Sequence, residues 1–228
     1  MMRSWGARAD TAVTDEPLYA HYLLDAGFDH PARNEILATH DGDWRRVTRW
    51  LVGDPPAGAS LWFQKHMAKH LAGVEELSWV TSLRHFLLIR DPARVLASWT
   101  AVTGAATVED TGLPQLVRVH EQLTERLGGA PLVVDADDVV ADPEAVLRAL
   151  CAALDVVFDP AMLSWEPGLR ETDGLWARHW YHGVESSTGW GQPDVGDPPV
   201  LPDDLAAVLA EVAPLYEQLH AIRLTVTG

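Results

Sequence analysis

Residues 84–99 read Arg-His-Phe-Leu-Leu-Ile-Arg-Asp-Pro-Ala-Arg-Val-Leu-Ala-Ser-Trp. The run Phe86–Ile89 is wholly apolar and too short for a helix, which predicts a strand buried on both faces, as in a parallel sheet. Asp91 can cap a helix that begins at Pro92, because its carboxylate accepts orphan backbone N–H bonds and proline has no N–H to leave unused. The sequence therefore predicts a strand that is followed at once by a helix.

Arg90 ends this predicted strand, and Ser98 lies about two turns into the predicted helix. In open α/β sheets, ligands bind at the carboxyl ends of the strands. A guanidinium forms charge-assisted bidentate bonds with a phosphate and a hydroxyl adds one donor, so Arg90 and Ser98 suit a phosphate site. The alternative is that Arg90 pairs with an acidic neighbour such as Asp91 and that Ser98 only faces solvent.

The composition limits what the chain can bind. Its 228 residues carry a formal net charge of −16, which argues against a nucleic-acid groove or an anionic membrane surface as a partner. No apolar run approaches membrane-spanning length and no signal peptide is recognisable, so we expect a cytoplasmic protein. The single cysteine, Cys151, falls on an apolar helical stripe and is expected to fill the core.

Short strands alternate with helical patterns along the chain, which indicates an α/β fold with three layers: a mainly parallel sheet flanked by helices. The predicted strands cover residues 11–14, 60–64, 86–89 and 131–135. The clearest helical patterns cover residues 18–24, 31–40, 43–52, 113–127 and 202–220, and capped helix starts lie at Pro92 and Pro143. Without repeats or low-complexity tracts, we predict one domain over residues 1–228.

Two segments resemble one family. The first is the predicted strand 86–89, followed by Arg90-Asp91-Pro92 and a helix that carries Ser98. This segment resembles the 3′-phosphate-binding element of sulfotransferases that use 3′-phosphoadenosine 5′-phosphosulfate (PAPS). Residues 8–23, Arg-x-Asp-Thr-x-Val-x-Asp-Glu-Pro-x-Tyr-Ala-x-Tyr-Leu, are similar to bacterial sulfotransferase-like proteins just after their phosphate-binding loop. The resemblance implies a P-loop-NTPase-like fold, PAPS as co-substrate and a 3′-phosphate bound by Arg90 and Ser98.

The phosphate-binding loop of these relatives, with the strand before it, is missing from the sequence. Such a loop would hold the 5′-phosphosulfate with successive backbone N–H groups. The strand before the loop should be central in the sheet, so without it two neighbouring apolar strands would each have an exposed edge. Either the first methionine is internal to a longer natural product, or the chain is a relative that lost cofactor chemistry. The coherent core pattern of the remaining chain favours the first explanation.

Polar residues gather after the predicted strand 60–64. Sulfuryl transfer needs a base for the acceptor proton and a cation near the transferring group. Lys65 can be that cation, because its spacing from Arg90 is similar to that of a sulfotransferase lysine, although Met67 stands where those enzymes have a histidine. The candidates for the base are Glu16, His66 and His70. The alternative for each histidine is an ordinary packed or solvated residue.

Residues 28–58 and 159–197 are expected to be insertions that shape the acceptor side. Within the second insertion, Arg178 and Gly183 lie where sulfotransferases carry a basic, glycine-containing loop that closes over the nucleotide. The resemblance therefore implies that both residues bind the cofactor. Nearby tryptophans could stack on adenine or on an apolar acceptor.

The leading interpretation is a sulfotransferase that moves a sulfuryl group from PAPS to a hydroxyl or amine of a small-molecule acceptor. One alternative is a truncated or non-catalytic relative that binds a nucleotide or a partner protein, and a further one is an ATP-binding, kinase-like P-loop protein. An open sheet centre would favour association of two copies as a homo-oligomer. No metal is expected, because His66 and His70 lack a third ligand.

Overall fold

The computed structural model describes residues 1–27, 32–192 and 199–226. The chain forms two compact units, of which the first contains Met1–Leu83 and Phe158–Gly191 and the second contains Arg84–Val157 and Gln192–Gly228. Pro31, which the sequence places in a helix, and parts of the two predicted insertions lie outside the described residues.

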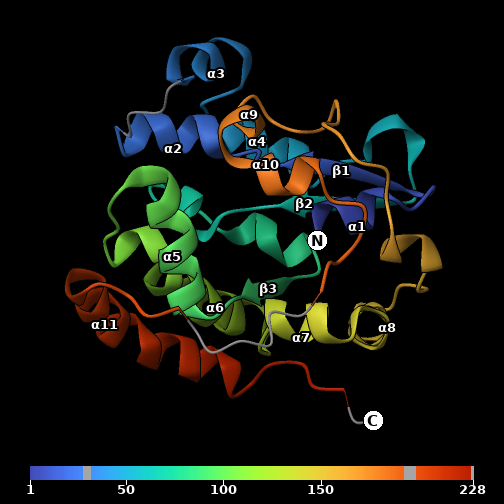
Figure 1. Cartoon of the computed structure of the whole chain (residues 1–228). Helices are drawn as coiled ribbons and strands as arrows, with labels where there is room; N and C mark the ends of the chain where they lie inside the picture. The colour runs from blue at the N-terminus through green and yellow to red at the C-terminus, as the bar shows by residue number, and fades with distance from the viewer. Residues whose placement is uncertain (28–31, 193–198, 227–228) are drawn as a thin grey trace. The chain divides into compact units, whose positions relative to one another are not determined.

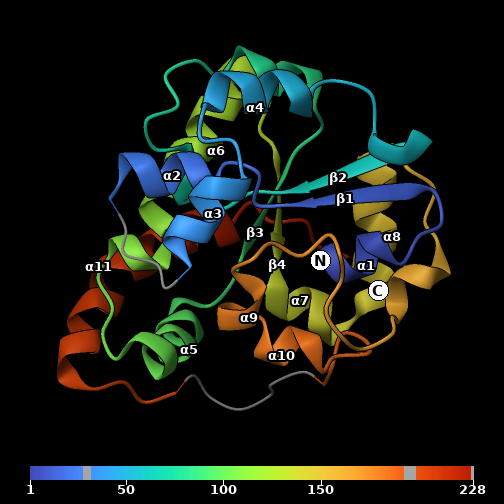
Figure 2. The ribbon, with the colours of Figure 1, turned by 90° about the horizontal axis from the view of Figure 1, so that it is seen from above.

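The first unit is built on two parallel strands. β1 (Thr11–Asp15) pairs with β2 (Leu61–Lys65) from Thr11 opposite Leu61 to Asp15 opposite Lys65, and Figure 2 shows the two strands side by side. The segment between them forms α2 (Tyr19–Asp25), α3 (Arg33–Thr39), α4 (Trp44–Leu51) and the 3₁₀ turn η1 (Pro56–Gly58). The other elements of this unit are α1 (Met2–Gly6), η2 (Ala68–Leu71), η3 (Ser78–Ser82), η5 (Pro160–Leu163), α9 (Ala177–Trp180) and α10 (His182–Glu185).

The helices of the first unit begin where the sequence supplies a cap and bury one face. The Asp43 side chain accepts from the backbone N–H of Arg45 at 3.0 Å and so caps α4. The apolar core of this unit joins α2 and α3 to a tryptophan from the C-terminal segment, and its buried members are Tyr19, Ala20, Leu23, Ala32, Ile36 and Trp176. The tryptophan-rich segment therefore packs on the helices that follow β1.

The second unit also holds two parallel strands. β3 (Phe86–Ile89) pairs with β4 (Leu132–Asp135), with Ile89 opposite Asp135. The helices of this unit are α5 (Pro92–Thr103), α6 (Leu113–Leu127), α7 (Ala136–Ala141), α8 (Pro143–Ala153) and α11 (Asp203–His220), and η4 (Glu109–Thr111) is a short 3₁₀ turn. Figure 1 shows α11 beside α5 and α6.

The predicted helix signals of the second unit are confirmed. Asp91 accepts from the backbone N–H of Arg94 at 3.0 Å at the start of α5, and Asp142 accepts from the N–H of Ala145 at 3.1 Å at the start of α8. α6 ends at Gly128, which has a φ of 69° that suits glycine. Cys151 is fully buried in α8, as expected for a core residue.

The parallel pairing is as predicted, and short parallel sheets flanked by helices form a mixed α/β fold. The expectation of one sheet needs correction, because the described strands form two sheets of two strands each, β1–β2 and β3–β4. A strand can extend a ladder only where another backbone offers it N–H and C=O groups. In the described part of the chain, no strand joins the two pairs.

Candidate functional site

The register of the first sheet brings opposite charges together at its carboxyl end. Asp15 and Lys65 are paired residues, and the backbone N–H of Glu16 donates to the carbonyl oxygen of Lys65 at 2.8 Å. Glu16 has a φ of 44°, in the left-handed region that costs energy for a residue with a side chain. Its position before Pro17 restricts its backbone further. A strained turn therefore places the Glu16 carboxylate beside Lys65.

The ammonium of Lys65 has three partners in the first unit. It lies 3.1 Å from Asp15 Oδ1 and 2.6 Å from the hydroxyl of Tyr181, and it forms an ion pair with Glu16 Oε1. The Asp15 side chain is 0% exposed and that of Glu16 is 9% exposed, whereas that of Lys65 is 28% exposed. Two buried carboxylates and one phenol thus hold a single cation that is partly open to solvent.

Burial and charge shift the proton affinities of this cluster in different directions. Burial raises the pKa of Glu16 above its ordinary value of 4.5, and the positive charge of Lys65 does not fully offset the effect. Burial alone would lower the pKa of Lys65, but the charges of Glu16 and Asp15 raise it above its ordinary value. Lys65 therefore stays cationic, while Glu16 is a carboxylate with increased proton affinity, which suits a general base.

The two candidate histidines have different surroundings. His70 is 2% exposed, and its ring stacks against those of Tyr19 and Tyr22, with centroids 4.6 and 4.7 Å away. Its Nδ1 lies 3.7 Å from Glu16 Oε2, and burial lowers the pKa of the imidazole well below its ordinary value, so the ring is neutral. The structure thus brings His70 to Glu16 as a packed, uncharged neighbour.

His66 points to other partners. Its Nε2 lies 3.4 Å from Gln64 Oε1, and its ring lies 5.9 Å from that of Trp79. These two contacts of His66 are with neighbours in β2 and η3.

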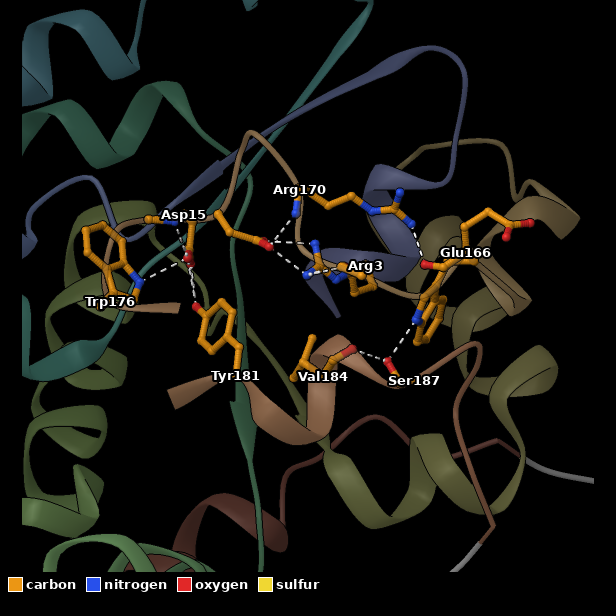
Figure 3. Close-up of polar contacts among 12 residues, drawn as sticks. Arg3, Asp15, Glu166, Arg170, Trp176, Tyr181, Val184 and Ser187 are labelled. Carbon is orange, nitrogen blue, oxygen red and sulfur yellow. Dashed lines mark hydrogen bonds and ion pairs between the residues drawn. The ribbon is translucent and has the colours of Figure 1, made fainter. Parts of the chain in front are cut away.

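Two aromatic residues complete the cluster, and the sequence did not identify them as site residues. Trp176 is 1% exposed and donates from Nε1 to Asp15 Oδ2 at 3.0 Å, and the hydroxyl of Tyr181 donates to the same carboxylate at 2.8 Å (Figure 3). Asp15 was also missed as a site residue. The adjacent acids Asp15 and Glu16 at the end of a strand were the available signal, but the two aromatic partners, which flank α9, lie more than 150 residues away.

Arg178 and Gly183, which the resemblance assigns to the cofactor, lie on two short helices of the first unit. Arg178 in α9 forms an ion pair with Glu35 of α3, and both side chains are about half exposed. Gly183 in α10 has open space around it, since a Cβ there would meet nothing within 4 Å. Neither residue contacts the Lys65 cluster through a hydrogen bond or ion pair within the described part of the chain.

Arg90 and Ser98 belong to the second unit. Arg90 follows β3 and is exposed, and it forms no hydrogen bond or ion pair with another residue among those described. Ser98 is exposed on α5. The neighbouring Arg94 lies 3.6 Å from Asp137 Oδ2, whereas the Asp91 side chain, the candidate partner for Arg90, accepts from the backbone N–H of Arg94.

Within residues 1–27, 32–192 and 199–226, no group of three or more His, Cys, Asp or Glu side chains is arranged to hold a metal ion. Among the helices of the same residues, none has both the length and the apolar character that a membrane span requires.

Gly174, two residues before Trp176, lies close against the Trp176 ring. A Cβ at Gly174 would overlap the indole ring of Trp176, so Gly174→Ala is expected to lower the free energy of unfolding by about 1–3 kcal/mol. Urea denaturation followed by circular dichroism measures the change. The matched control is Gly129→Ala, where a Cβ would meet nothing within 4 Å. Equal losses in the two variants would contradict the packing described for Trp176.

Curated relatives match nearly the whole chain. Branched-chain-amino-acid aminotransferase-like protein 2 of Arabidopsis thaliana is 35% identical over 221 residues, which are 96% of this chain and 39% of that protein. Branched-chain-amino-acid aminotransferase-like protein 1 of the same organism is 35% identical over 222 residues, 97% of this chain and 39% of that protein. The chain thus spans about two-fifths of the length of these relatives.

Two solved structures share a weaker likeness. The sulfotransferase domain from the curacin biosynthetic pathway is 15% identical, covers 86% of this chain and 78% of its own, and has a TM-score of 0.38. The sulfotransferase domain from the Synechococcus PCC 7002 olefin synthase is 16% identical, covers 89% of this chain and 93% of its own, and has a TM-score of 0.39. Neither likeness is close enough to assign a residue.

The family itself is shown by sequence. A profile of the family described as "Sulfotransferase domain" matches residues 1–223, which is nearly all of the 228-residue chain and spans both compact units. This match confirms the resemblance first carried by residues 8–23 and by the Arg90-Asp91-Pro92 element. The chain belongs to the sulfotransferase domain family.

Proposed function

We propose that this protein transfers a sulfuryl group from PAPS to a hydroxyl or amine of a small-molecule acceptor. The observation that supports the proposal most is the buried Glu16–Lys65 pair at the carboxyl end of the β1–β2 sheet, in a chain of the sulfotransferase family. PAPS, when bound, supplies the activated sulfuryl group. The acceptor atom bonds to sulfur, and the bond from sulfur to the bridging phosphate oxygen breaks with its electron pair on that oxygen.

Glu16 is the base in this proposal. Its carboxylate takes the proton that the acceptor hydroxyl or amine loses, and its raised pKa favours that uptake. The proton then passes from Glu16 to water. His70 is the weaker candidate for the base, because it is 2% exposed and stacked against two tyrosines. His66 is also weaker, since its Nε2 faces the Gln64 side chain and its ring lies beside that of Trp79.

Lys65 supplies positive charge near the transferring group. Before proton transfer its ammonium faces the carboxylates of Asp15 and Glu16, which would repel an approaching anion. Once Glu16 has taken a proton, only the Asp15 carboxylate remains charged. The charge of Lys65 is therefore least compensated when negative charge develops on the leaving oxygen, which is when stabilisation lowers the barrier.

The second unit holds the residues proposed for the 3′-phosphate. Arg90 is exposed and unpaired among the described residues, and Ser98 is exposed on the helix that begins two residues after it. This unit has only seven Lys and Arg residues against seventeen Asp and Glu residues. A free guanidinium in so acidic a unit suits a phosphate, because few other cations there could bind it.

Arg178 and Gly183 are also proposed to contact the nucleotide. The Arg178–Glu35 pair is half exposed on both sides, so its strength in water is small and a phosphate could replace the carboxylate. The open space at Gly183 would let a ligand approach the backbone closely.

Transfer of radiolabelled sulfuryl from [³⁵S]PAPS tests the proposal. The folded chain is incubated with panels of phenols, aliphatic alcohols and amines, and labelled product is separated from PAPS by thin-layer chromatography. We expect labelled product with at least one acceptor class, and none after boiling the protein. Binding of the nucleotide without product from any acceptor would contradict the proposal and would favour a nucleotide-binding module.

A further inference from the structure

The Asp15 carboxylate receives an unusual number of donors. Its Oδ1 accepts from Lys65 at 3.1 Å, and its Oδ2 accepts from Trp176 Nε1 at 3.0 Å. The hydroxyl of Tyr181 bridges both oxygens at 2.9 and 2.8 Å, and the backbone N–H of Gly174 lies 3.3 Å from Oδ2 (Figure 3). With a side chain that is 0% exposed, Asp15 has no competing contact with solvent.

These contacts do more than attach residues 166–187 to the rest of the first unit, because that segment is also held by an ion pair that does not involve Asp15. The guanidinium of Arg3 in α1 binds both oxygens of Asp173 at 2.8 and 2.7 Å, and their side chains are 6% and 3% exposed. Arg3 also donates to the carbonyl oxygen of Gly168 at 3.2 Å, and the backbone N–H of Arg170 donates to Asp173 at 2.7 Å (Figure 3). This anchor has no contact with Lys65.

We propose that Asp15 is the positioning residue of the site, which holds Lys65 and the Tyr181 hydroxyl in place while Glu16 changes its charge. The inference rests on the proposed function. When Glu16 takes a proton, its attraction for Lys65 weakens, because a neutral carboxyl no longer forms an ion pair. Asp15 is then the one remaining carboxylate partner of Lys65 in the described cluster, and Tyr181 keeps its bond to both residues.

The matched test compares Asp15→Asn with Asp10→Asn. Both changes replace a carboxylate by an amide. Asp15 is the last residue of β1 and Asp10 lies just before its first, but Asp10 pairs with Arg8 at 2.9 Å and not with Lys65. For Asp15→Asn we expect kcat for sulfuryl transfer to fall about 10- to 100-fold, with the KM for PAPS changed less than about threefold. For Asp10→Asn we expect kcat within about twofold of the unchanged protein.

A second readout follows Lys65 without any nucleotide. The protein is treated with acetic anhydride over a range of pH values, and acetylation of Lys65 is quantified by peptide mass spectrometry. Asp15→Asn removes one carboxylate from the ammonium, so Lys65 is expected to react several-fold faster, whereas Asp10→Asn leaves its rate unchanged. The groups that face Lys65 in this titration are Asp15, Glu16, Tyr19, Tyr181, His70 and the α-amino group of Met1.

A variant that keeps the carboxylate covers the case in which Asp15→Asn does not fold. Tyr181→Phe removes only the hydroxyl that joins Asp15 to Lys65. Like Asp15→Asn, it should speed the acetylation of Lys65 and lower kcat, but both effects should be smaller. Unchanged Lys65 reactivity in the folded variants would overturn the positioning role. Failure of the proposed function would be seen differently. The unchanged protein would then show no sulfuryl transfer, while the acetylation rates of Lys65 would still differ between Asp15→Asn and Asp10→Asn.

Discussion

Glu16→Gln is expected to lower kcat for sulfuryl transfer about 10²- to 10⁴-fold, the usual contribution of a general base. Glutamine keeps the shape of the side chain but cannot accept the acceptor proton. Lys65 keeps Asp15 and Tyr181 as partners, so the binding of adenosine 3′,5′-bisphosphate (PAP) should be retained. Steady-state kinetics with [³⁵S]PAPS measures kcat, and calorimetry with PAP measures nucleotide binding.

The pH profile of the unchanged protein supports the same assignment. The base must be ionised to accept a proton, so the rate should rise as the pH increases through the pKa of Glu16. Because burial raises that pKa, the rise should lie above the ordinary carboxyl value of 4.5, and Glu16→Gln should abolish it. The control is Glu75→Gln, since Glu75 is 76% exposed and pairs with Arg45 on the surface. A rate within threefold of normal in Glu16→Gln would exclude Glu16 as the base.

The second large effect is expected for Arg90→Ala. Loss of a bidentate guanidinium–phosphate contact should lower the affinity for PAP at least about 100-fold, which calorimetry at ordinary protein concentrations registers as no binding. The melting temperature should stay within about 2 °C, because Arg90 is exposed and forms no hydrogen bond or ion pair with the other described residues. Thermal unfolding therefore separates a lost contact from a lost fold.

Arg126→Ala is the matched control for Arg90→Ala. Arg126 is an exposed arginine of the same unit, in the last turn of α6, and its replacement by alanine removes the same charge. Its PAP affinity should match that of the unchanged protein. If Arg90→Ala and Arg126→Ala bind PAP equally well, the Arg90-Asp91-Pro92 element does not bind the 3′-phosphate.

Local signals predicted most of the secondary structure. The apolar run Phe86–Ile89 and the cap at Asp91 gave the bounds of β3 and the start of α5, and the periodic stripe of α6 with Gly128 after it gave both ends of that helix. Each of these features depends on residues within a few positions of one another. Caps, proline at the first turn and glycine at the end act at that range, so sequence is enough to read them.

The candidate site could be predicted only in part. The carboxyl ends of adjacent parallel strands meet at one edge, which is why the sequence could place Glu16 and Lys65 in the same site. The Trp176 and Tyr181 contacts with Asp15 join positions 161 and 166 residues apart, and no local pattern specifies such a contact. His66 and His70 looked equivalent in sequence, but the turn at η2 buries His70 beside Glu16 and leaves His66 with Gln64 and Trp79.

Isothermal titration calorimetry of the folded chain with PAP, with ATP as the comparison, tests the central claim most directly. PAP and ATP are both adenine nucleotides, but only PAP carries the 3′-phosphate that Arg90 and Ser98 are proposed to bind. Our account predicts saturable binding of PAP that is at least about tenfold tighter than that of ATP, and loss of this preference in Arg90→Ala. Equal binding of PAP and ATP, or binding of neither by the folded chain, would contradict it.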